Sequence, residues 1–445
     1  MKKYLYLILS CTLFLCYSCS DDDDGYKTFP VSIQLVYPTD GQLSATTGVK
    51  VTLTDTNEKA YTVETDAGGK ADFILPSGVY NASVTDKRAI DGYSYTYNGS
   101  KNGIALTDLW TGLEPVEVTL SEVKTGQIVI KELYVGGCQK DDGSGVFQMD
   151  KYVILYNNSD QQAKLDNLCL GMVLPYNSHG SNNDYVGGSL LYANEGWIPA
   201  GNGIWYFQSR MTMKPGEEVV IALNGAIDHT PVYSNSIDFA NPDYYCTYDP
   251  ASGYSNTSYY PAPSSVIPAS HYLLAKMYGA GNAWALSTLS PAFFVFHTDG
   301  VSPADFVDDP ANENYYGGTV SKANARRKVP TEWILDGIEV FTASSTANKK
   351  RLTPAVDGGA VYLEHQHGHA LYRNVDKEST EALAGNQGKL VYSYSMGTTI
   401  DGNESTDPSG IDAEASIRNG ARIIYQDTNN STNDFHQRKQ ASLRD

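Results

Sequence analysis

The segment VETDAGGKADFILPSGVYNASV, residues 63–84, alternates apolar and polar side chains on both sides of a proline-glycine turn. Two sets of apolar residues fall on one side of an extended chain: Ala71, Phe73 and Leu75, then Tyr80, Ala82 and Val84. A period of two is typical of strands that bury one face. Gly68 and Gly69 offer the positive φ that a tight turn requires. The segment therefore predicts consecutive antiparallel strands.

The same alternation recurs on both sides of this segment. The further sets are Val31, Ile33 and Leu35; Val49, Val51 and Leu53; and Val116, Val118 and Leu120. Together they predict a small antiparallel β-sandwich over residues 28–122. The whole chain has 445 residues, with 40 glycines, 33 tyrosines and only 19% charged residues. This composition favours an all-β protein with many turns, and the length favours more than one domain.

Residues 63–84 resemble the carboxypeptidase-regulatory or transthyretin-like β-sandwich, and the resemblance covers most of residues 28–122. It implies a spacer or interaction module and brings no catalytic residues with it.

The remainder, residues 126–445, contains GQIVIKELYVGG (126–137) and DKYVILYNNSDQQAKLDNLCLG (150–171). These stretches resemble the lamin-tail fold, an Ig-like sandwich. The matching positions are Glu132, Asp150, Tyr152, Leu155, Tyr156, Asn157, Leu165, Asp166 and Leu170. Lys151 and Ile154 stand where that family often has acidic residues, which weakens its acidic face. The expected fold is therefore two tandem β-sandwiches, the second carrying a Tyr-rich insertion at about 226–325 that the lamin-tail fold does not need.

The first 18 residues have the pattern of a secretory signal. Lys2 and Lys3 precede an apolar stretch over residues 4–17, which is too short for the roughly 20 residues of a spanning helix. Ser18 and Cys19 then resemble the end of a bacterial lipobox. This resemblance implies a signal peptide over 1–18 and a lipid on Cys19, with Cys16 as the alternative acceptor.

Residues 19–27 form an acidic linker that contains four consecutive aspartates at 21–24. This run resembles the export tag of Bacteroidota surface lipoproteins; a solvated linker is the alternative. The whole layout is similar to Bacteroidota lipoproteins of a family of unknown function. It implies an outer-membrane, cell-surface protein whose partners are the membrane and, by analogy, a TonB-dependent transporter. The net charge of −19 argues against nucleic acid.

The Tyr-rich insertion contains the first candidate binding residues. These are Tyr244, Tyr245, Tyr248, Tyr254, Tyr259 and Tyr260, flanked by Trp197 and Trp205. Amphipathic rings among Ser, Asn and Gly are typical of contact surfaces, so a glycan or peptide ligand is expected. Alternatively, the loop wraps the sandwich with its tyrosines half-buried.

Two further stretches have the residue types of metal ligands. In EHQHGHAL (364–371), an extended chain would place His365, His367 and His369 on one side, a spacing that suits Zn²⁺. In DGNESTDPSGID (401–412), Asp401, Asn403 and Asp407 occupy positions one, three and seven of a Ca²⁺ loop, but Thr406 replaces its glycine. A surface loop and an ordinary acidic turn are the respective alternatives, and no other cofactor is expected.

No catalytic signature is present: GxSxG, the Walker A lysine, HExxH and GxGxxG are all missing. The main hypothesis is a non-catalytic surface lipoprotein that binds a glycan or peptide. The alternatives are a hydrolase that uses carboxylates or a metal, and a structural or adhesion component of the cell surface. Cys138 and Cys169 either form a disulfide or remain buried thiols.

Overall fold

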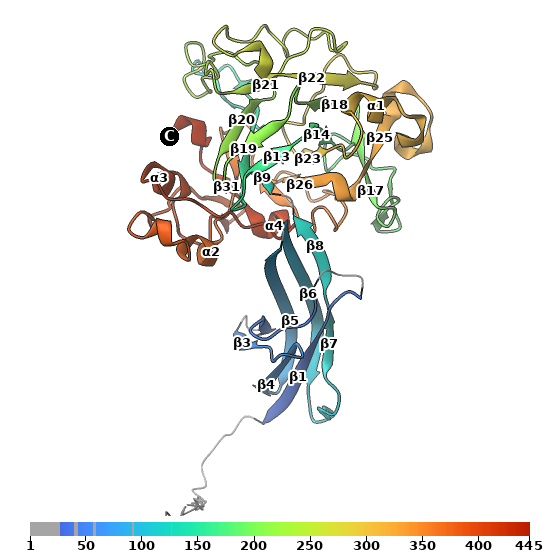
Figure 1. Cartoon of the computed structure of the whole chain (residues 1–445), viewed down its shortest axis with the longest axis vertical. Helices are drawn as coiled ribbons and strands as arrows, with labels where there is room; N and C mark the ends of the chain where they lie inside the picture. Colours follow the sequence, from blue (N-terminus) through green and yellow to red (C-terminus); the bar gives the residue numbers. More distant parts are fainter. Residues whose placement is uncertain (1–26, 40–42, 57–58, 91–92, 126) are drawn as a thin grey trace, which may run out of the picture. The chain divides into compact units, whose positions relative to one another are not determined.

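The computed structural model describes residues 27–39, 43–56, 59–90, 93–125 and 127–445 (Figure 1). The predicted signal peptide, Cys19 and the acidic run at 21–24 lie outside these residues. The chain forms two compact units, one made of Met1–Thr85 with Gly99–Leu120 and the other of Asp86–Asn98 with Ser121–Asp445. Strands dominate both units, so the all-β prediction is confirmed.

The first unit contains two layers of strands with alternating burial, and the predicted antiparallel pairing holds except for one parallel pair, residues 33–36 with 116–119. One sheet has the order β4 (Lys70–Pro76), β1 (Thr28–Val36), β7 (Val116–Thr119). The other has the order β3 (Ala60–Glu64), β2 (Lys50–Asp55), β5 (Gly78–Ile90), β6 (Tyr93–Leu106), β8 (Ser121–Thr125). Residues 86–98 of β5 and β6 and the whole of β8 belong to the second unit. The predicted inward residues are buried, including Ile33, Leu53 and Phe73. Gly69 has φ 76° in the predicted turn.

The second unit is built on one large sheet. Its strands, in sheet order, are β27 (Val361–Leu363), β26 (Ile334–Thr342), β23 (Ala292–His297), β14 (Leu168–Met172), β18 (Gly203–Tyr206), β22 (Tyr272–Met277), β21 (Tyr245–Thr247), β20 (Glu218–Ala222), β12 (Tyr152–Asn157), β9 (Ile128–Tyr134), β28 (Ala370–Arg373) and β31 (Phe435–Arg438). β26 contacts β9, and the terminal strands β27 and β31 contact each other. The sheet therefore curls, and its two halves enclose one hydrophobic core.

Smaller pairs and short helices surround the large sheet. The pairs are β10 (Cys138–Gln139) with β11 (Val146–Phe147), β13 (Ala163–Leu165) with β19 (Met211–Met213), β15 (Tyr185–Val186) with β16 (Ser189–Leu190), β17 (Trp197–Gly201) with β25 (Ala325–Pro330) and β24 (Glu313–Tyr315), and β29 (Thr398–Ile400) with β30 (Asn403–Ser405). The helices are α1 (Pro303–Asp308), α2 (Lys377–Glu381), α3 (Ala413–Arg418) and α4 (Ser431–Asp434). Within the described part of the chain, no helix has the length and apolarity needed to cross a membrane.

The segment expected as an insertion, residues 226–325, is instead part of the sheet. It supplies β21, β22 and β23, and β22 pairs with β18 while β23 pairs with both β14 and β26. β23, AFFVFH, is apolar from Ala292 to Phe296 because both faces of the strand are covered there. It therefore lacks the alternation that marks a half-exposed strand.

Candidate ligand-binding cleft

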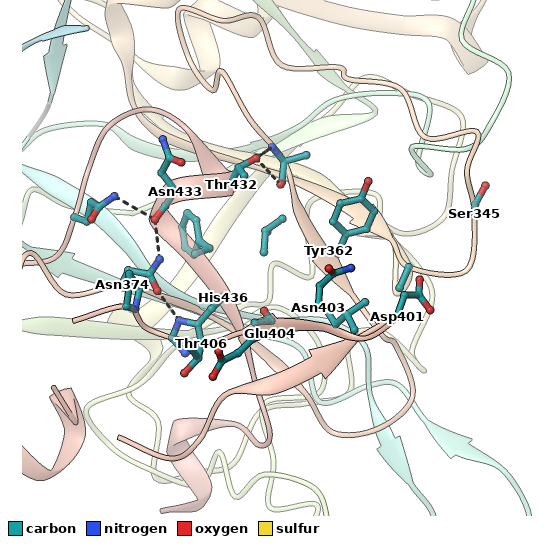
Figure 2. Close-up of a pocket in the computed structure, with 18 of the residues that line it drawn as sticks. Ser345, Tyr362, Asn374, Asp401, Asn403, Glu404, Thr406, Thr432, Asn433 and His436 are labelled. Carbon is teal, nitrogen blue, oxygen red and sulfur yellow. Dashed lines mark hydrogen bonds between the residues drawn. The ribbon is translucent and has the colours of Figure 1, made fainter. Parts of the chain in front are cut away.

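An open polar cleft of about 950 Å³ borders the two terminal strands of the large sheet (Figure 2). We call it the edge cleft. Residues 360–362 around β27 line one wall, while Phe435 and His436 of β31 lie beside α4. Its polar lining residues are Ser345, Thr346, Tyr362, Asn374, Asp401, Asn403, Glu404, Ser405, Thr406, Gln426, Thr432, Asn433 and His436. The volume is within the range of pockets that hold small ligands.

The β29–β30 hairpin forms the facing side of the edge cleft. Asp401 and Gly402 connect its strands with φ 49° and 82°, the left-handed conformation that a two-residue hairpin turn requires. The turn places Asp401, Asn403 and Glu404 in the lining. Figure 2 shows Glu404 and Thr406 along one side of the opening and Thr432 and Asn433 along the other.

The hairpin corrects the predicted Ca²⁺ loop. Asp407 is buried, and its carboxylate accepts hydrogen bonds from the backbone N–H groups of Val375 at 2.9 Å and Ser409 at 2.8 Å. It is therefore turned away from Asp401 and Asn403, which remain at the cleft. Among the described residues, no group of three or more His, Cys, Asp or Glu side chains could hold a metal ion.

Side-chain hydrogen bonds link the two sheet edges at both ends of β27. At one end, Thr432 Oγ1 accepts from the backbone N–H of Ala360 at 3.0 Å and donates to its carbonyl at 2.9 Å. At the other end, Gln437 accepts from the backbone N–H of Glu364 at 2.6 Å and donates to the Glu364 carboxylate at 3.2 Å. These bonds link β27 to the chain around β31, and the two terminal strands contact each other without pairing as neighbours in the sheet.

His436 is a neutral, buried part of the cleft floor. Its Nδ1 lies 2.7 Å from Asn374 Oδ1, and its Nε2 is hydrogen-bonded to the Tyr394 hydroxyl. Burial, followed by the positive charge of Arg438, lowers the pKa of the His436 imidazole to about 3. The neutral ring donates through Nδ1 and accepts at Nε2, which fixes the orientation of Asn374.

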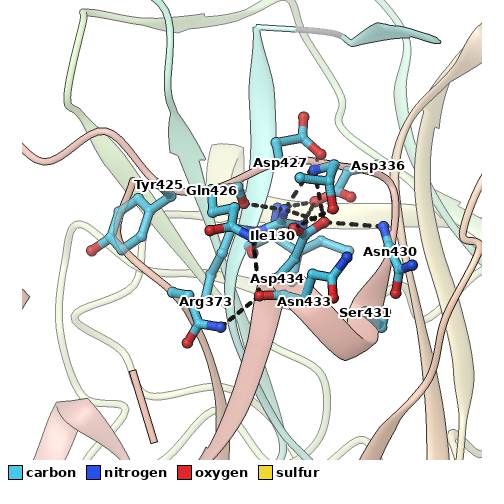
Figure 3. Close-up of polar contacts among 12 residues, drawn as sticks. Ile130, Asp336, Arg373, Tyr425, Gln426, Asp427, Asn430, Ser431, Asn433 and Asp434 are labelled. Carbon is cyan, nitrogen blue, oxygen red and sulfur yellow. Dashed lines mark hydrogen bonds and ion pairs between the residues drawn. The ribbon is translucent and has the colours of Figure 1, made fainter. Parts of the chain in front are cut away.

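A buried charge network lies behind this floor (Figure 3). We call it the Arg373 network: the Arg373 guanidinium pairs with Asp336 and lies 3.5 Å from Asp427 and 3.9 Å from Asp434. Burial raises the pKa of Asp336 to about 7 and that of Asp434 to about 6, while the Arg373 charge opposes both shifts.

The Arg373 network fixes the loop that leads into α4. Asp434 accepts from the backbone N–H of Thr428 at 2.9 Å and of Asn430 at 3.1 Å. Arg373 Nε donates to the carbonyl of Ile130 at 2.7 Å. The network therefore connects the polar wall of the edge cleft to β9.

The structure does not gather the predicted aromatic residues into one surface. Trp205, Tyr254 and Tyr260 are buried in the central core, where the Trp205 ring lies 5.7 Å from Tyr254 and 5.4 Å from Tyr260. A ligand-binding role for these three residues is wrong, because their faces are already covered. Burial of large aromatic rings stabilises the folded protein more than their exposure to water would.

The other predicted aromatic residues are partly buried and lie on different clusters. Tyr245, Tyr248 and Tyr259 pack against the central core, Tyr244 packs against the cluster on the outer face of β12, and Trp197 packs against the cluster around β14. Tyr245 stacks on His271 with ring centroids 4.0 Å apart. These tyrosines are partly buried, as the alternative expected, although the segment belongs to the sheet and does not wrap it.

The histidine run is not extended, so its three side chains do not share one side of a strand. Gln366 and Gly368 have φ 72° and 76°, and they turn the chain between β27 and β28. His367 and His369 stack with ring centroids 5.5 Å apart. Burial and the charge of His367 lower the pKa values of His365 and His369. Cys138, Cys169 and Cys246 are free and buried, as the thiol alternative expected.

Sequence reasoning missed most of the edge cleft. Tyr362, Asn374 and the pair Thr432 and His436 come from three separate segments, and none belongs to a recognisable local motif. Only the 401–407 pattern led to this region, although for the wrong reason. The one local signal was the alternation of AVYLE, residues 360–364, which exposes Tyr362 between buried Val361 and Leu363.

Comparison with known proteins shows that part of the chain is similar to a family whose function is not assigned. Residues 214–409 match the family model described as "Protein of unknown function (DUF4876)". The fold is similar to the crystal structure, at 2.50 Å resolution, of a DUF4876 family protein from Bacteroides thetaiotaomicron VPI-5482. The TM-score is 0.50 at 17% identity, covering 92% of this chain and 94% of that one. No curated protein matches the sequence.

Proposed function

We propose that this protein is a non-catalytic, lipid-anchored protein of the outer-membrane surface that binds an uncharged glycan in the edge cleft. The observation that carries the proposal is the lining of the cleft. It combines side-chain amides and hydroxyls with one exposed aromatic ring, Tyr362. Amides and hydroxyls both donate and accept hydrogen bonds, which suits a ligand made of hydroxyl groups.

Tyr362 is positioned to support a flat apolar face of a sugar. Its side chain is 47% exposed, and Phe341 packs edge-on against it with ring centroids 5.8 Å apart. A ring that is held in place loses little conformational freedom when it binds a ligand.

The charge of the edge cleft favours a ligand without negative groups. Asp401 and Glu404 line it, and no lysine or arginine does so among the described residues. The Arg373 network behind it contains three carboxylates for one guanidinium. A phosphate or sulfate would therefore meet the negative charge of these carboxylates, with no lining lysine or arginine among the described residues to offset it.

The placement of the carboxylates favours binding over hydrolysis. Glycosidases use two carboxyl groups that flank the bond to be cleaved. Here Asp401 and Glu404 both belong to the β29–β30 hairpin, whereas the described residues of the facing side, such as Tyr362, Thr432 and Asn433, carry no carboxylate.

One observation favours a second candidate, an extended peptide. β27 is a terminal strand that pairs only with β26, and its other edge borders the cleft. A peptide could add to this edge by main-chain hydrogen bonds. A peptide ligand would tolerate the loss of Tyr362 provided that the main-chain bonds remained.

The first prediction concerns Tyr362→Ala. A neutral glycan identified on an array is expected to bind this variant roughly tenfold more weakly by calorimetry, equivalent to about 1.4 kcal/mol, because the stacking face is lost. Tyr392→Ala is the matched control, since Tyr392 is 56% exposed and does not line the edge cleft. Equal affinity of both variants for the glycan would contradict the proposed site.

The anchor is tested separately. Cys19→Ala is expected to abolish labelling by radioactive palmitate and to move the protein into the soluble fraction, because a protein without acyl chains has no stable attachment. Cys16→Ala is expected to retain both label and attachment. Protease shaving of intact cells then tests surface exposure, and co-purification with a TonB-dependent transporter tests that partner. Absence of label in the wild-type protein would reject the anchor.

A further inference from the structure

The loop between β6 and β7, residues 107–115, exposes two leucines. Leu109 is 90% exposed and Leu113 is 82% exposed, more than any other large apolar side chain among the described residues. We call this segment, TDLWTGLEP, the tip loop. Two such leucines within five residues form a group of exposed apolar side chains, and grouped exposure of this kind is typical of a contact surface.

The tip loop is held in one conformation. The Trp110 indole N–H donates to the carbonyl of Pro30 at 2.9 Å, and the Trp110 backbone N–H donates to the carbonyl of Thr107 at 2.8 Å. Gly112 has φ 62°, and a Cβ there would lie 3.2 Å from the Pro30 carbonyl oxygen. The leucines are therefore presented outward by a loop that is attached to β1.

The attachment point is the place where the chain enters the first unit. Asp108 forms an ion pair with Lys27, the first described residue, and Figure 1 shows the tip loop at the same end of the unit as the start of β1. Ile74, 76% exposed, faces solvent opposite Pro30 in the β1–β4 pair and adds apolar surface there.

The length of the preceding chain identifies what covers this surface. Lys27 is eight residues after Cys19, so even a fully extended linker spans no more than about 30 Å. If Cys19 is acylated, as proposed above, the lipid surface lies within that reach of Lys27, whose ion-pair partner Asp108 directly precedes Leu109. Tryptophan is also the side chain that prefers the membrane–water interface.

We infer that the tip loop is a second membrane contact, which inserts Leu109 and Leu113 into the lipid surface beside the acylated cysteine. The inference rests on the proposed anchor. The Lys27–Asp108 pair is neutral overall, while Glu114 and the aspartates at 21–24 are acidic, so the surface suits zwitterionic lipid better than anionic lipid. The acyl chains retain the protein, and the tip loop sets which end of the first unit faces the bilayer.

The experiment uses the full acylated protein in phosphatidylcholine vesicles. Hydrogen exchange of residues 107–115 is expected to be at least fivefold slower in the vesicle-bound protein than in the Cys19→Ala variant, which has no acyl chains and is measured in solution without detergent. In Leu109→Ser/Leu113→Ser, still acylated, this protection is expected to disappear. Val320→Ser is the matched control, because Val320 is 75% exposed and belongs to the other unit.

The intact mass of the protein shows whether it is acylated, and this separates the lipid anchor from the tip-loop contact. If the protein carries its acyl chains and the tip loop exchanges equally fast with and without vesicles, the inference is wrong and the anchor stands. If the protein is not acylated, the anchor is wrong, and the unmodified protein mixed with vesicles must still show tip-loop protection for the inference to survive. Protection in outer-membrane fragments but not in pure lipid would overturn the lipid assignment in favour of a protein contact.

Discussion

Arg373→Met is expected to lower the free energy of unfolding of the second unit by about 3–5 kcal/mol, because it leaves buried carboxylates without their counter-charge. Arg373 and Asp336 are both almost completely buried, and they form the closest ion pair of the Arg373 network. Asp427 and Asp434 would also lose their partner. The measurement is urea unfolding followed by tryptophan fluorescence, since Trp197, Trp205, Trp284 and Trp333 lie in this unit.

A matched control shows whether the loss of stability comes from the burial of the charges or from the loss of any ion pair. Arg210 pairs with Asp166 at 2.5 Å, but both side chains are more than half exposed, at 58% and 55%. Arg210→Met is therefore expected to change stability by less than about 1 kcal/mol. A similar loss for both variants would show that burial of the Arg373 network is not what makes it important.

Because Arg373 anchors the polar wall of the edge cleft, its replacement should also lower the affinity of the cleft for its ligand. The carbonyls of Gln426 and Asn433 accept hydrogen bonds from Arg373 Nη1 at 3.0 Å and from the Asn374 amide at 2.7 Å, and both residues line the edge cleft. If Arg373→Met destabilises the unit while affinity is unchanged at temperatures well below unfolding, the network stabilises the fold without positioning the cleft.

The second large effect is expected in acid. His436→Gln should make the protein less acid-sensitive: between pH 7 and pH 5 the wild type is expected to lose about 2 kcal/mol more stability than the variant. The folded-state pKa of His436, about 3, lies below its unfolded value. Its contribution to stability is therefore present above the unfolded pKa and is lost as pH falls, because the unfolded chain takes up a proton that the folded protein excludes.

Other groups change stability in the opposite direction and must be separated. The raised pKa values of Asp336 and Asp434, about 7 and about 6, contribute stability that is lost as pH rises through them. Both carboxyls are present in wild type and variant, so they cancel in the difference. Histidine NMR gives a direct measurement: the His436 ring signal should not titrate above pH 4. A titration midpoint near 6 would contradict the neutral, doubly hydrogen-bonded ring.

The candidate site shows where local sequence information ends. Residues 401–412 have the pattern of either a Ca²⁺ loop or an acidic turn; residues 401–402 form a tight turn, and the Asp407 carboxylate accepts hydrogen bonds from backbone N–H groups. Tyr362 and Thr432 are 70 residues apart and show no shared pattern. They line one cleft only because β27 and the segment leading into β31 lie at opposite ends of a curled sheet.

The aromatic composition correctly indicated the all-β fold class, but it did not predict which tyrosines would be exposed. The tyrosines of residues 233–263 were expected at a surface, yet Tyr254 and Tyr260 enclose Trp205 in the core. A tyrosine hydroxyl can be buried when it finds a partner, and here Tyr254 donates to the Asn202 carbonyl at 3.1 Å. No property of the tyrosine itself reveals whether such a partner will be present.

The sequence by itself determined the all-β class, the inward faces of the first sandwich and the positions of its glycine turns, because side-chain alternation and backbone φ depend on near neighbours. Only the tertiary structure decided which strands become the two free edges, which carboxylates gather around Arg373, and which aromatic rings remain exposed. Those outcomes depend on contacts between residues such as Ile130 and Asp336, 206 positions apart, and such contacts exist only after the sheet has curled.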